Sequence, residues 1–145
     1  MLRMTFAAAA VAVVSMTSML PSTPVSAAGA VAVGQPANVA KNGIAVGLNG
    51  DWDTKAHART DAVIQCKATN VKSSTRALCH VVSTFSNQCA AIAMDPQGGT
   101  SGFGWAVANS TWEAKQQALV SCRSSAGSRA DACKVITTSC DGDAR

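Results

Sequence analysis

The hydrophobic and polar positions of the chain follow one pattern that occurs twice. Each copy ends in a run rich in Val, Ile and Thr between two cysteines, at residues 79–89 and again at residues 133–140. β-Branched residues favour strands, and the flanking cysteines allow such a strand to be joined covalently to its neighbours. Residues 90–94, Ala-Ala-Ile-Ala-Met, directly follow the first of these runs, so they mark the start of the second copy.

A stripe of small residues predicts a helix in the first copy. Ala58, Ala62 and Cys66 are spaced by four residues, so they lie on one face of a helix that runs to about residue 68. Asp53 or Thr54 precedes this segment and supplies the side-chain oxygen of an N-cap.

The second copy restates this helix without a gap in the pattern. Ala114, Ala118 and Cys122 form the same stripe, and Ser110 with Glu113 three residues later is the sequence signature of a capping box. We therefore expect two equivalent helices, each followed by a polar loop and a strand that begins beside a cysteine.

Shorter segments complete each copy. In the first, residues 44–46 predict a strand, and residues 48–51, which contain Asn-Gly, predict a hairpin turn. In the second, residues 90–94 predict the equivalent strand, residues 95–99 a turn with Pro and Gly, and residues 101–107 a returning strand.

Each copy thus has the order strand, strand, helix, strand, with repeat one at residues 43–89 and repeat two at residues 90–140. Two copies of one unit predict a pseudo-symmetric α+β domain. We expect an antiparallel sheet with two helices on one face, stapled by disulfides. The domain as a whole spans residues 43–145.

The residues before this domain have a different composition. Residues 1–27 combine an early Arg, a short apolar run and a Val-Ser-Ala end, which is the layout of a cleaved signal peptide, and the run is too short for a membrane anchor. Residues 28–42 contain Gly and Pro without a clear period, so we expect a flexible lead-in. No later stretch is long and apolar enough to predict a second membrane span.

The charge of the chain argues against nucleic-acid binding. Removal of residues 1–27 takes Arg3 away and changes the formal net charge from +4 to +3. The remaining Lys and Arg residues are scattered along the sequence, whereas nucleic-acid binders concentrate such residues in a stripe or patch.

Six cysteines predict three disulfides, because an even number in a small exported domain is typical of a disulfide framework. Fifteen pairings of six cysteines are available, and the equivalence of the two copies favours one of them. The favoured pairs are Cys66 with Cys79, Cys122 with Cys133, and Cys89 with Cys140, the last of which we expect to join the halves.

These residues resemble the domain of unknown function 4189 family of small exported bacterial proteins. The stretches that carry the resemblance, within about residues 43–140, are residues 43–46, 79–89, 90–93, 102–105 and 114–122. The resemblance implies export and the repeat fold. It implies no reaction, because the family has no established activity and no catalytic residues. The chain departs from the family pattern at residues 51–54, which replace a longer strand containing Gly and aromatic residues.

His57 with Asp51 or Asp53 is the best candidate for a catalytic group. A catalytic histidine needs an orienting carboxylate and a nucleophile within reach, and only Ser101 or Ser110 is available for the second role. The alternative is that Asp53 caps the helix and His57 lies on its solvent-exposed face. We favour that structural interpretation and assign no catalytic residue.

Other chemistry-bearing residues also favour structural roles. His80 occupies the position of Lys134 in the second copy, which indicates a surface site. Thiols that form disulfides cannot bind zinc, so we expect no metal and no cofactor. The glycine-rich residues 98–104 lack the Lys-Ser/Thr of a phosphate-binding loop, so they predict a hairpin.

The aromatic residues Phe103, Trp105 and Trp112 are the candidate partner contacts, although core packing is the default role of Trp105 and Trp112. Trp112 precedes the alanine stripe by two residues, which places it at the edge of the packed helix face, and Ala56 occupies its position in the first copy. Together with Phe103 it predicts a partly exposed aromatic patch of the kind that anchors a partner.

The sequence therefore favours a secreted, disulfide-rich, non-enzymatic module that binds an unknown protein or an envelope component. It is expected outside the cytoplasm, in the medium, the periplasm or the cell envelope, with no membrane span once the signal is removed. The alternatives are a small secreted hydrolase that uses His57, and a structural protein of the cell envelope.

Overall fold

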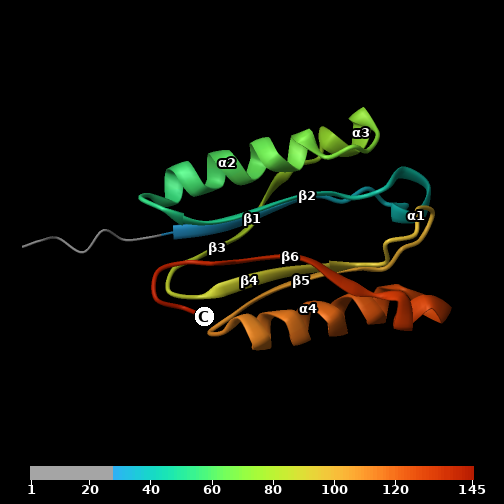
Figure 1. Ribbon diagram of the computed structural model, residues 1–145. Coiled ribbons are helices and arrows are strands. Elements are labelled where there is room, and N and C mark those ends of the chain that lie inside the picture. Colours follow the sequence, from blue (N-terminus) through green and yellow to red (C-terminus); the bar gives the residue numbers. More distant parts are fainter. Residues whose placement is uncertain (1–27) are drawn as a thin grey trace, which may run out of the picture.

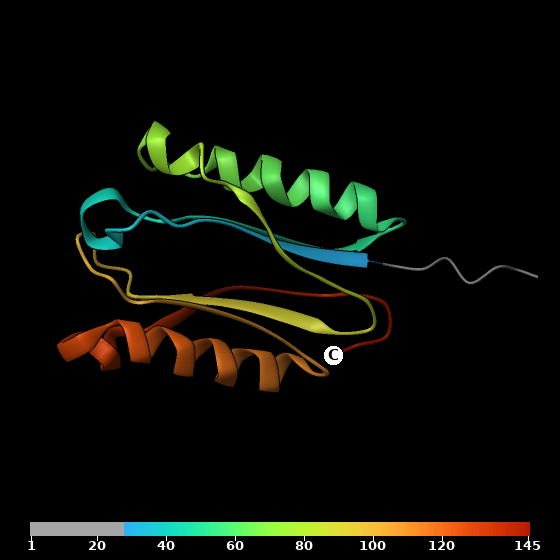
Figure 2. The same cartoon turned by 180° about the vertical axis from the view of Figure 1, so that it is seen from behind.

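Two three-stranded antiparallel sheets lie face to face, and a long helix covers the outer face of each (Figure 1; Figure 2 gives the view from behind). This computed structural model describes residues 28–145. The first repeat contains β1 (Ala28–Gly34), α1 (Val39–Asn42), β2 (Ala45–Trp52), α2 (Lys55–Ala68), α3 (Ser73–Arg76) and β3 (His80–Phe85). The second contains β4 (Cys89–Met94), β5 (Phe103–Ala108), α4 (Thr111–Ser125), the 3₁₀ helix η1 (Gly127–Ala132) and β6 (Lys134–Cys140).

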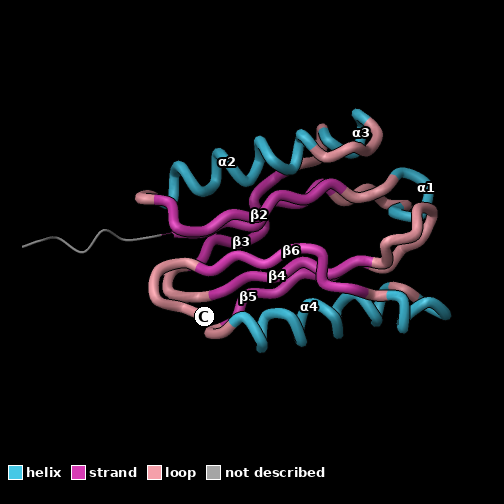
Figure 3. Tube along the Cα trace, viewed as in Figure 1, coloured by secondary structure: helices cyan, strands magenta, loops and turns pink. Residues whose placement is uncertain are grey.

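The two sheets have the same topology. The strand order is β2-β1-β3 in one and β5-β4-β6 in the other, so each repeat places its first strand in the middle. Figure 3 shows the strands as the inner layers and the helices as the outer ones. The α+β class and the disulfide staples are confirmed.

We expected one sheet with both helices on one face, and this arrangement of layers is wrong, because the structure has two sheets. Strands alternate small residues toward the helix with Val, Ile or Phe toward the other sheet, since side chains along a strand point to opposite faces. A single sheet with both helices on one face would leave the larger side chains in water. Stacking the sheets buries them in a central core formed by Val31, Val33, Ile44, Phe85, Ala90, Ile92 and Phe103.

The flexible lead-in is also corrected, because its first half is the buried central strand β1. Ala28, Ala30 and Ala32 face α2, while Val31 and Val33 face the second sheet. Because one face of β1 carries only small residues, its sequence alternates weakly between small and larger apolar residues, and this weak pattern did not predict a strand. Repeat one therefore begins at residue 28 and not at residue 43. The strand equivalent to residues 90–94 is β1, whereas residues 44–46 belong to the next one.

The predicted hairpin turn at residues 48–51 does not form. β2 runs without interruption through Asn49, and the β1–β2 connection is made earlier in the chain. Asn49 instead joins three elements: it accepts the backbone N–H of Ala30 at 3.1 Å and donates to the carbonyl of Ala58 at 2.8 Å and to Asp61 at 3.0 Å. Its polar side chain thus pairs with α2, because β2 packs directly against that helix.

Both helices form as predicted, with their alanine stripes fully buried. Thr54 caps α2 by accepting the N–H of His57, and Ser110 caps α4 by accepting that of Glu113. The helices come close to the sheets because Gly47 and Gly104 lie opposite them. A Cβ atom at Gly47 would lie 2.0 Å from the carbonyl oxygen of Ala62, and one at Gly104 would lie 2.4 Å from the backbone nitrogen of Cys122.

The cysteines pair as predicted, as Cys66–Cys79, Cys89–Cys140 and Cys122–Cys133. The expected role of one pair is wrong. Cys89 and Cys140 are direct neighbours on β4 and β6, so this disulfide closes the second sheet and does not join the two halves.

Candidate functional site

His57 has an orienting carboxylate, but within residues 28–145 its imidazole makes no hydrogen bond to a hydroxyl or thiol. Its Nδ1 lies 2.8 Å from Asp53 Oδ1, and both side chains are exposed at the start of α2. The ring of Trp52 meets the imidazole edge-on, with 6.1 Å between centroids. Asp51, the other carboxylate considered, accepts the backbone N–H of Gly142 instead.

The two candidate serines have other contacts. Ser110 caps α4, on the opposite face of the sandwich from α2 (Figure 1). The hydroxyl of Ser101 donates to the carbonyl of Ser125 at 2.7 Å. The structure therefore does not bring His57 together with either serine.

His80 and the glycine-rich loop have the surroundings expected of structural residues. His80 is exposed at the start of β3, and its Nδ1 lies 2.9 Å from the carbonyl of Leu78. The loop connects β4 to β5 as a hairpin. It also borders a small cavity.

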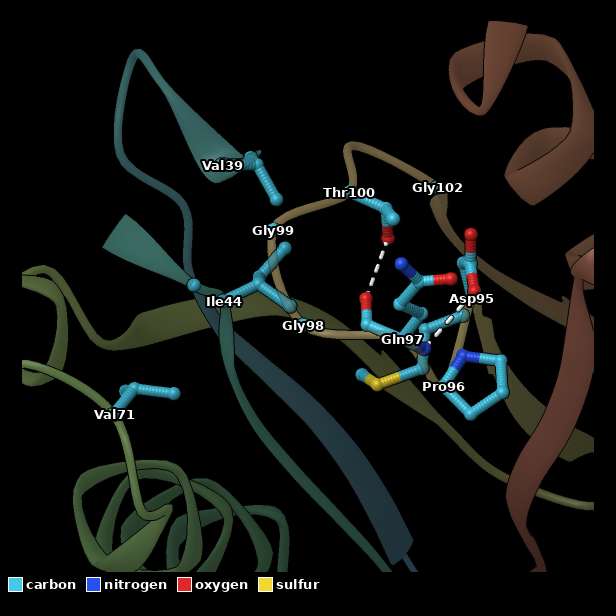
Figure 4. Close-up of a pocket in the computed structure, with 12 residues that line it drawn as sticks. Val39, Ile44, Val71, Asp95, Pro96, Gln97, Gly98, Gly99, Thr100 and Gly102 are labelled. Atoms are coloured by element: carbon cyan, nitrogen blue, oxygen red, sulfur yellow. Dashed lines mark hydrogen bonds between the residues drawn. The ribbon is translucent and has the colours of Figure 1, made fainter. Parts of the chain in front are cut away.

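A cavity of about 180 Å³ lies between this loop and the first repeat. In Figure 4, Val39, Ile44 and Val71 form one side and residues 95–102 form the other. Thr100 donates to the carbonyl of Gln97 at 2.9 Å and braces the loop. Its lining combines the aliphatic side chains of the first repeat with the polar side chains of Asp95, Gln97 and Thr100.

Asp95 anchors the loop beside this cavity. Arg129 donates to both of its carboxylate oxygens, through Nη2 at 3.0 Å and through Nε, and the N–H of Gln97 donates to it as well. The pKa of Asp95 is lowered from 3.8 to about 2. The hydrogen bonds from Arg129 are the largest cause, and the hydrogen bond from the Gln97 N–H is the second. The carboxylate is therefore ionised and fully engaged in holding the loop.

The three candidate aromatic contacts do not form one patch. Phe103 is only 8% exposed and packs between the sheets, and Trp105, on the same face of β5, is half-buried against that core. Trp112 lies on α4 and is 72% exposed. Because side chains along β5 alternate between its faces, Phe103 and Trp105 both point toward the core, so Trp112 is the exposed candidate of the three.

The outer face of α4 carries more than Trp112. Gln116 and Val120 follow at intervals of four residues, and both are exposed. We call these three residues the α4 stripe. Val120 was not predicted as an exposed residue, although the four-residue spacing of the buried alanines also predicts a second row of helix positions two residues before them.

Two open grooves flank the helices on the side of the strand that follows each one. The α2–β3 groove, of about 620 Å³, is lined by Arg59, Thr60, Val63, Ile64, Lys67, His80 and Val81. The α4–β6 groove, of about 320 Å³, is lined by Lys115, Val135, Ile136, Thr137 and Thr138. Both surfaces combine basic and aliphatic side chains.

Within residues 28–145, no three His, Cys, Asp or Glu side chains are placed to hold a metal ion together. In the same part of the chain, no helix has the length and hydropathy needed to cross a bilayer. The predicted signal peptide falls on residues 1–27, which lie outside the described residues.

Comparison with known proteins identifies the family and no individual relative. The sequence profile described as Domain of unknown function (DUF4189) matches residues 28–140. No curated protein and no solved structure matches the chain. The match begins at the first residue of β1 and ends at the last residue of β6, so it covers both repeats completely. This chain therefore belongs to the DUF4189 family, as the resemblance indicated.

Proposed function

We propose that this protein is an exported, non-enzymatic binding module that contacts a protein of the cell envelope through the α4 stripe. The observation that carries the proposal is the exposure of Trp112. The equivalent position of α2 holds Ala56, so the repeat fold does not require a large side chain there.

A large apolar side chain that stays in water gains nothing from the hydrophobic effect. A Trp that becomes buried against a partner contributes a large apolar area, and Trp is enriched among the residues that dominate binding energy. Val120, 64% exposed two turns along the helix, extends the apolar surface in the same direction. Gln116 between them offers a hydrogen-bonding group without a charge to desolvate.

Export is supported by the oxidised cysteines. All six thiols are paired, and disulfides of this kind persist in oxidising compartments outside the cytosol. The layout of residues 1–27 agrees with the same route.

The hydrolase alternative has one observation in its favour, the contact between His57 and Asp53. Acyl transfer also needs a nucleophile that the imidazole can deprotonate, and the candidate serines have other contacts. We therefore favour the binding role. No contact of the described residues favours a purely structural envelope protein over either.

The test places a photo-crosslinking amino acid at position 116, between Trp112 and Val120, in the protein made by its own cells. Irradiation should yield one discrete adduct with an envelope protein. Adding Trp112→Ala should abolish the adduct, because it removes the main contact without touching the buried stripe.

Trp52→Ala is the matched control. It removes another tryptophan, which is 37% exposed beside α2 and outside the α4 stripe. The adduct should persist in this variant, and also in His57→Ala. An adduct that survives Trp112→Ala in a folded protein would contradict the proposal, and so would its loss in Trp52→Ala.

A further inference from the structure

The two grooves occupy equivalent positions in the two repeats. Aligning Ala58 with Ala114 pairs Arg59 with Lys115. The strand registers place Val81 opposite Ala32 and Val135 opposite Ala93, which makes these two valines equivalent as well. One surface has therefore been made twice by the same fold.

The chemical character of this surface is the same in both halves. Positions that are basic in one repeat are basic in the other, and aliphatic positions stay aliphatic. Two equivalent pairs line both grooves, Arg59 with Lys115 and Val81 with Val135. Four further residues of the α2–β3 groove have equivalents of like character on α4 and β6 that lie outside the lining of the second groove: Val63 with Leu119, Ile64 with Val120, Lys67 with Arg123, and His80 with Lys134.

On the opposite side of each helix, equivalent positions do not carry side chains of the same chemical type. His57 in α2 corresponds to Glu113 in α4, and Asp61 corresponds to Gln117. The repeats have thus diverged where the helices face β2 and β5, while they retain like residues where the helices face β3 and β6.

Packing explains only part of this retention. Val63 and Leu119 are half-buried against their alanine cores, so the fold itself favours an aliphatic residue there. Ile64 is 59% exposed, however, and is as accessible as its equivalent Val120. Neither Arg59 nor Lys67 takes part in an ion pair among the described residues.

The free edges of the sheets lie beside the grooves but are not suited to strand addition. β3 and β6 are edge strands, and each has a register shift that leaves one residue unpaired, Val82 in β3 and Ile136 in β6. A bulge in an edge strand twists it away from a flat partner. Recognition in the grooves must therefore depend on side chains.

We propose that the two grooves are equivalent binding sites for an extended polypeptide segment in which acidic and aliphatic side chains alternate. The Lys and Arg side chains would pair with its carboxylates, and Ile64 or Val120 would pack against its aliphatic side chains. No acidic residue lines either groove, so the basic side chains of Arg59 and Lys67 in one groove and of Lys115 in the other meet no competing carboxylate there.

Other polyanions fit the surface less well. A membrane is flat, whereas α2 and α4 lie on opposite outer faces of the sandwich and cannot both rest on one plane (Figure 1). Single-stranded nucleic acid is usually held by several aromatic side chains that stack on its bases, whereas neither groove is lined by Phe, Tyr or Trp. The inference rests on the proposed binding function and names the partner's chemistry.

The experiment titrates the exported protein with a fluorescein-labelled peptide of alternating Glu and Val. We expect two peptides to bind per chain, with affinity that falls as ionic strength rises. Peptides of alternating Lys and Val, or of Glu and Ser, should bind at least about tenfold more weakly, since they lack the charge or the aliphatic contact.

Charge reversal assigns the two sites. Arg59→Glu with Lys67→Glu should remove one site, Lys115→Glu with Arg123→Glu the other, and the four changes together should remove both. Lys41→Glu with Lys72→Glu alters the net charge equally outside the grooves and should change the affinity by less than about twofold. If a reversed protein unfolds, the corresponding Gln variants replace it.

Two results would overturn the inference: full binding by the fourfold variant, or equal weakening by the control pair. Tighter binding to anionic vesicles or to single-stranded DNA than to the peptide would also overturn it. The photo-crosslink at position 116 is read separately. Its loss in Trp112→Ala without peptide binding in the grooves would leave the proposed function standing and remove only this inference.

Discussion

The carboxylate of Asp141 accepts the backbone N–H of Asp51 at 3.2 Å, although 90 residues separate them in the chain. Its other oxygen accepts the N–H of Asn87 at 3.1 Å. Asp51 and Asn87 are the non-glycine residues of the described chain with positive φ, at 59° and 51°. One fully buried carboxylate therefore holds both of these unfavourable backbone conformations and ties the end of β2 to the β3–β4 connection.

Asp141→Ala should destabilise the fold strongly. It leaves two backbone N–H groups without their acceptor and removes what holds two left-handed residues, so we expect the free energy of unfolding to fall by about 2–4 kcal/mol. Urea denaturation measures this. Asp143→Ala, at an exposed position two residues on, is the control and should change it by less than about 0.5 kcal/mol. Equal effects in the two variants would contradict the role of the buried carboxylate.

The bond between Asp95 and Arg129 should make stability depend on acid pH. The folded pKa of Asp95, about 2, lies below its ordinary value of 3.8, so the folded state binds this proton less readily than the unfolded state does. The stabilisation is complete above pH 3.8 and is lost as the pH falls through about 2. Asp95→Asn should lower the thermal midpoint at neutral pH and flatten its fall in that window. Parallel curves for the two proteins would rule this contribution out.

Gly104→Ala should be poorly tolerated, because its Cβ would lie 2.4 Å from the backbone nitrogen of Cys122 in α4. Forcing the helix away from the sheet should cost about 1–3 kcal/mol. Gly98→Ala is a matched control in the same hairpin, since a Cβ there meets nothing within 4 Å. Its expected effect on the unfolding free energy is neutral or stabilising by up to about 1 kcal/mol. Reversal of this order would mean that the helix–sheet spacing is not set by the glycine.

The three disulfides should contribute unequally. Cys89 and Cys140 are separated by 51 positions, whereas Cys66 and Cys79 are separated by 13. Closing the longer loop restricts the unfolded chain more, which predicts a loss of about 4 kcal/mol for the double alanine variant at 89 and 140 and about 3 kcal/mol at 66 and 79. Chemical denaturation of the two variants tests the order, and a larger loss at 66 and 79 would contradict it.

The sequence predicted the features that recur between the repeats. The alanine stripes, the helix caps and the cysteine pairing could all be obtained by aligning one copy with the other. β1 was missed because Ala and Gly alternate with Val there, and such a strand shows little contrast between its faces. Without β1, the first repeat lacked its central strand, and the two-sheet arrangement could not be seen.

The candidate site was predictable to a similar extent. The exposure of Trp112 followed from its position relative to the alanine stripe. Phe103 was placed wrongly, because its burial depends on which face of β5 meets the other sheet, and that face exists only once two sheets are stacked. The grooves could not be predicted from the sequence, because their position depends on how the strands pair, and the spacing of residues along the chain does not give that pairing.

The placement of the disulfides has a consequence for the integrity of the molecule. Each of the three lies within one repeat, so the peptide segment 86–88 is the covalent connection between the halves of the described chain. A protease site inserted there would, once cut, yield a two-chain protein held without a covalent bond, by the central core and by hydrogen bonds such as those from Asp51 to Asp141 and from Gly142 to Asp51. Halves produced separately should then reassemble by complementation, and each would bring one complete sheet, its helix and one groove to the pair.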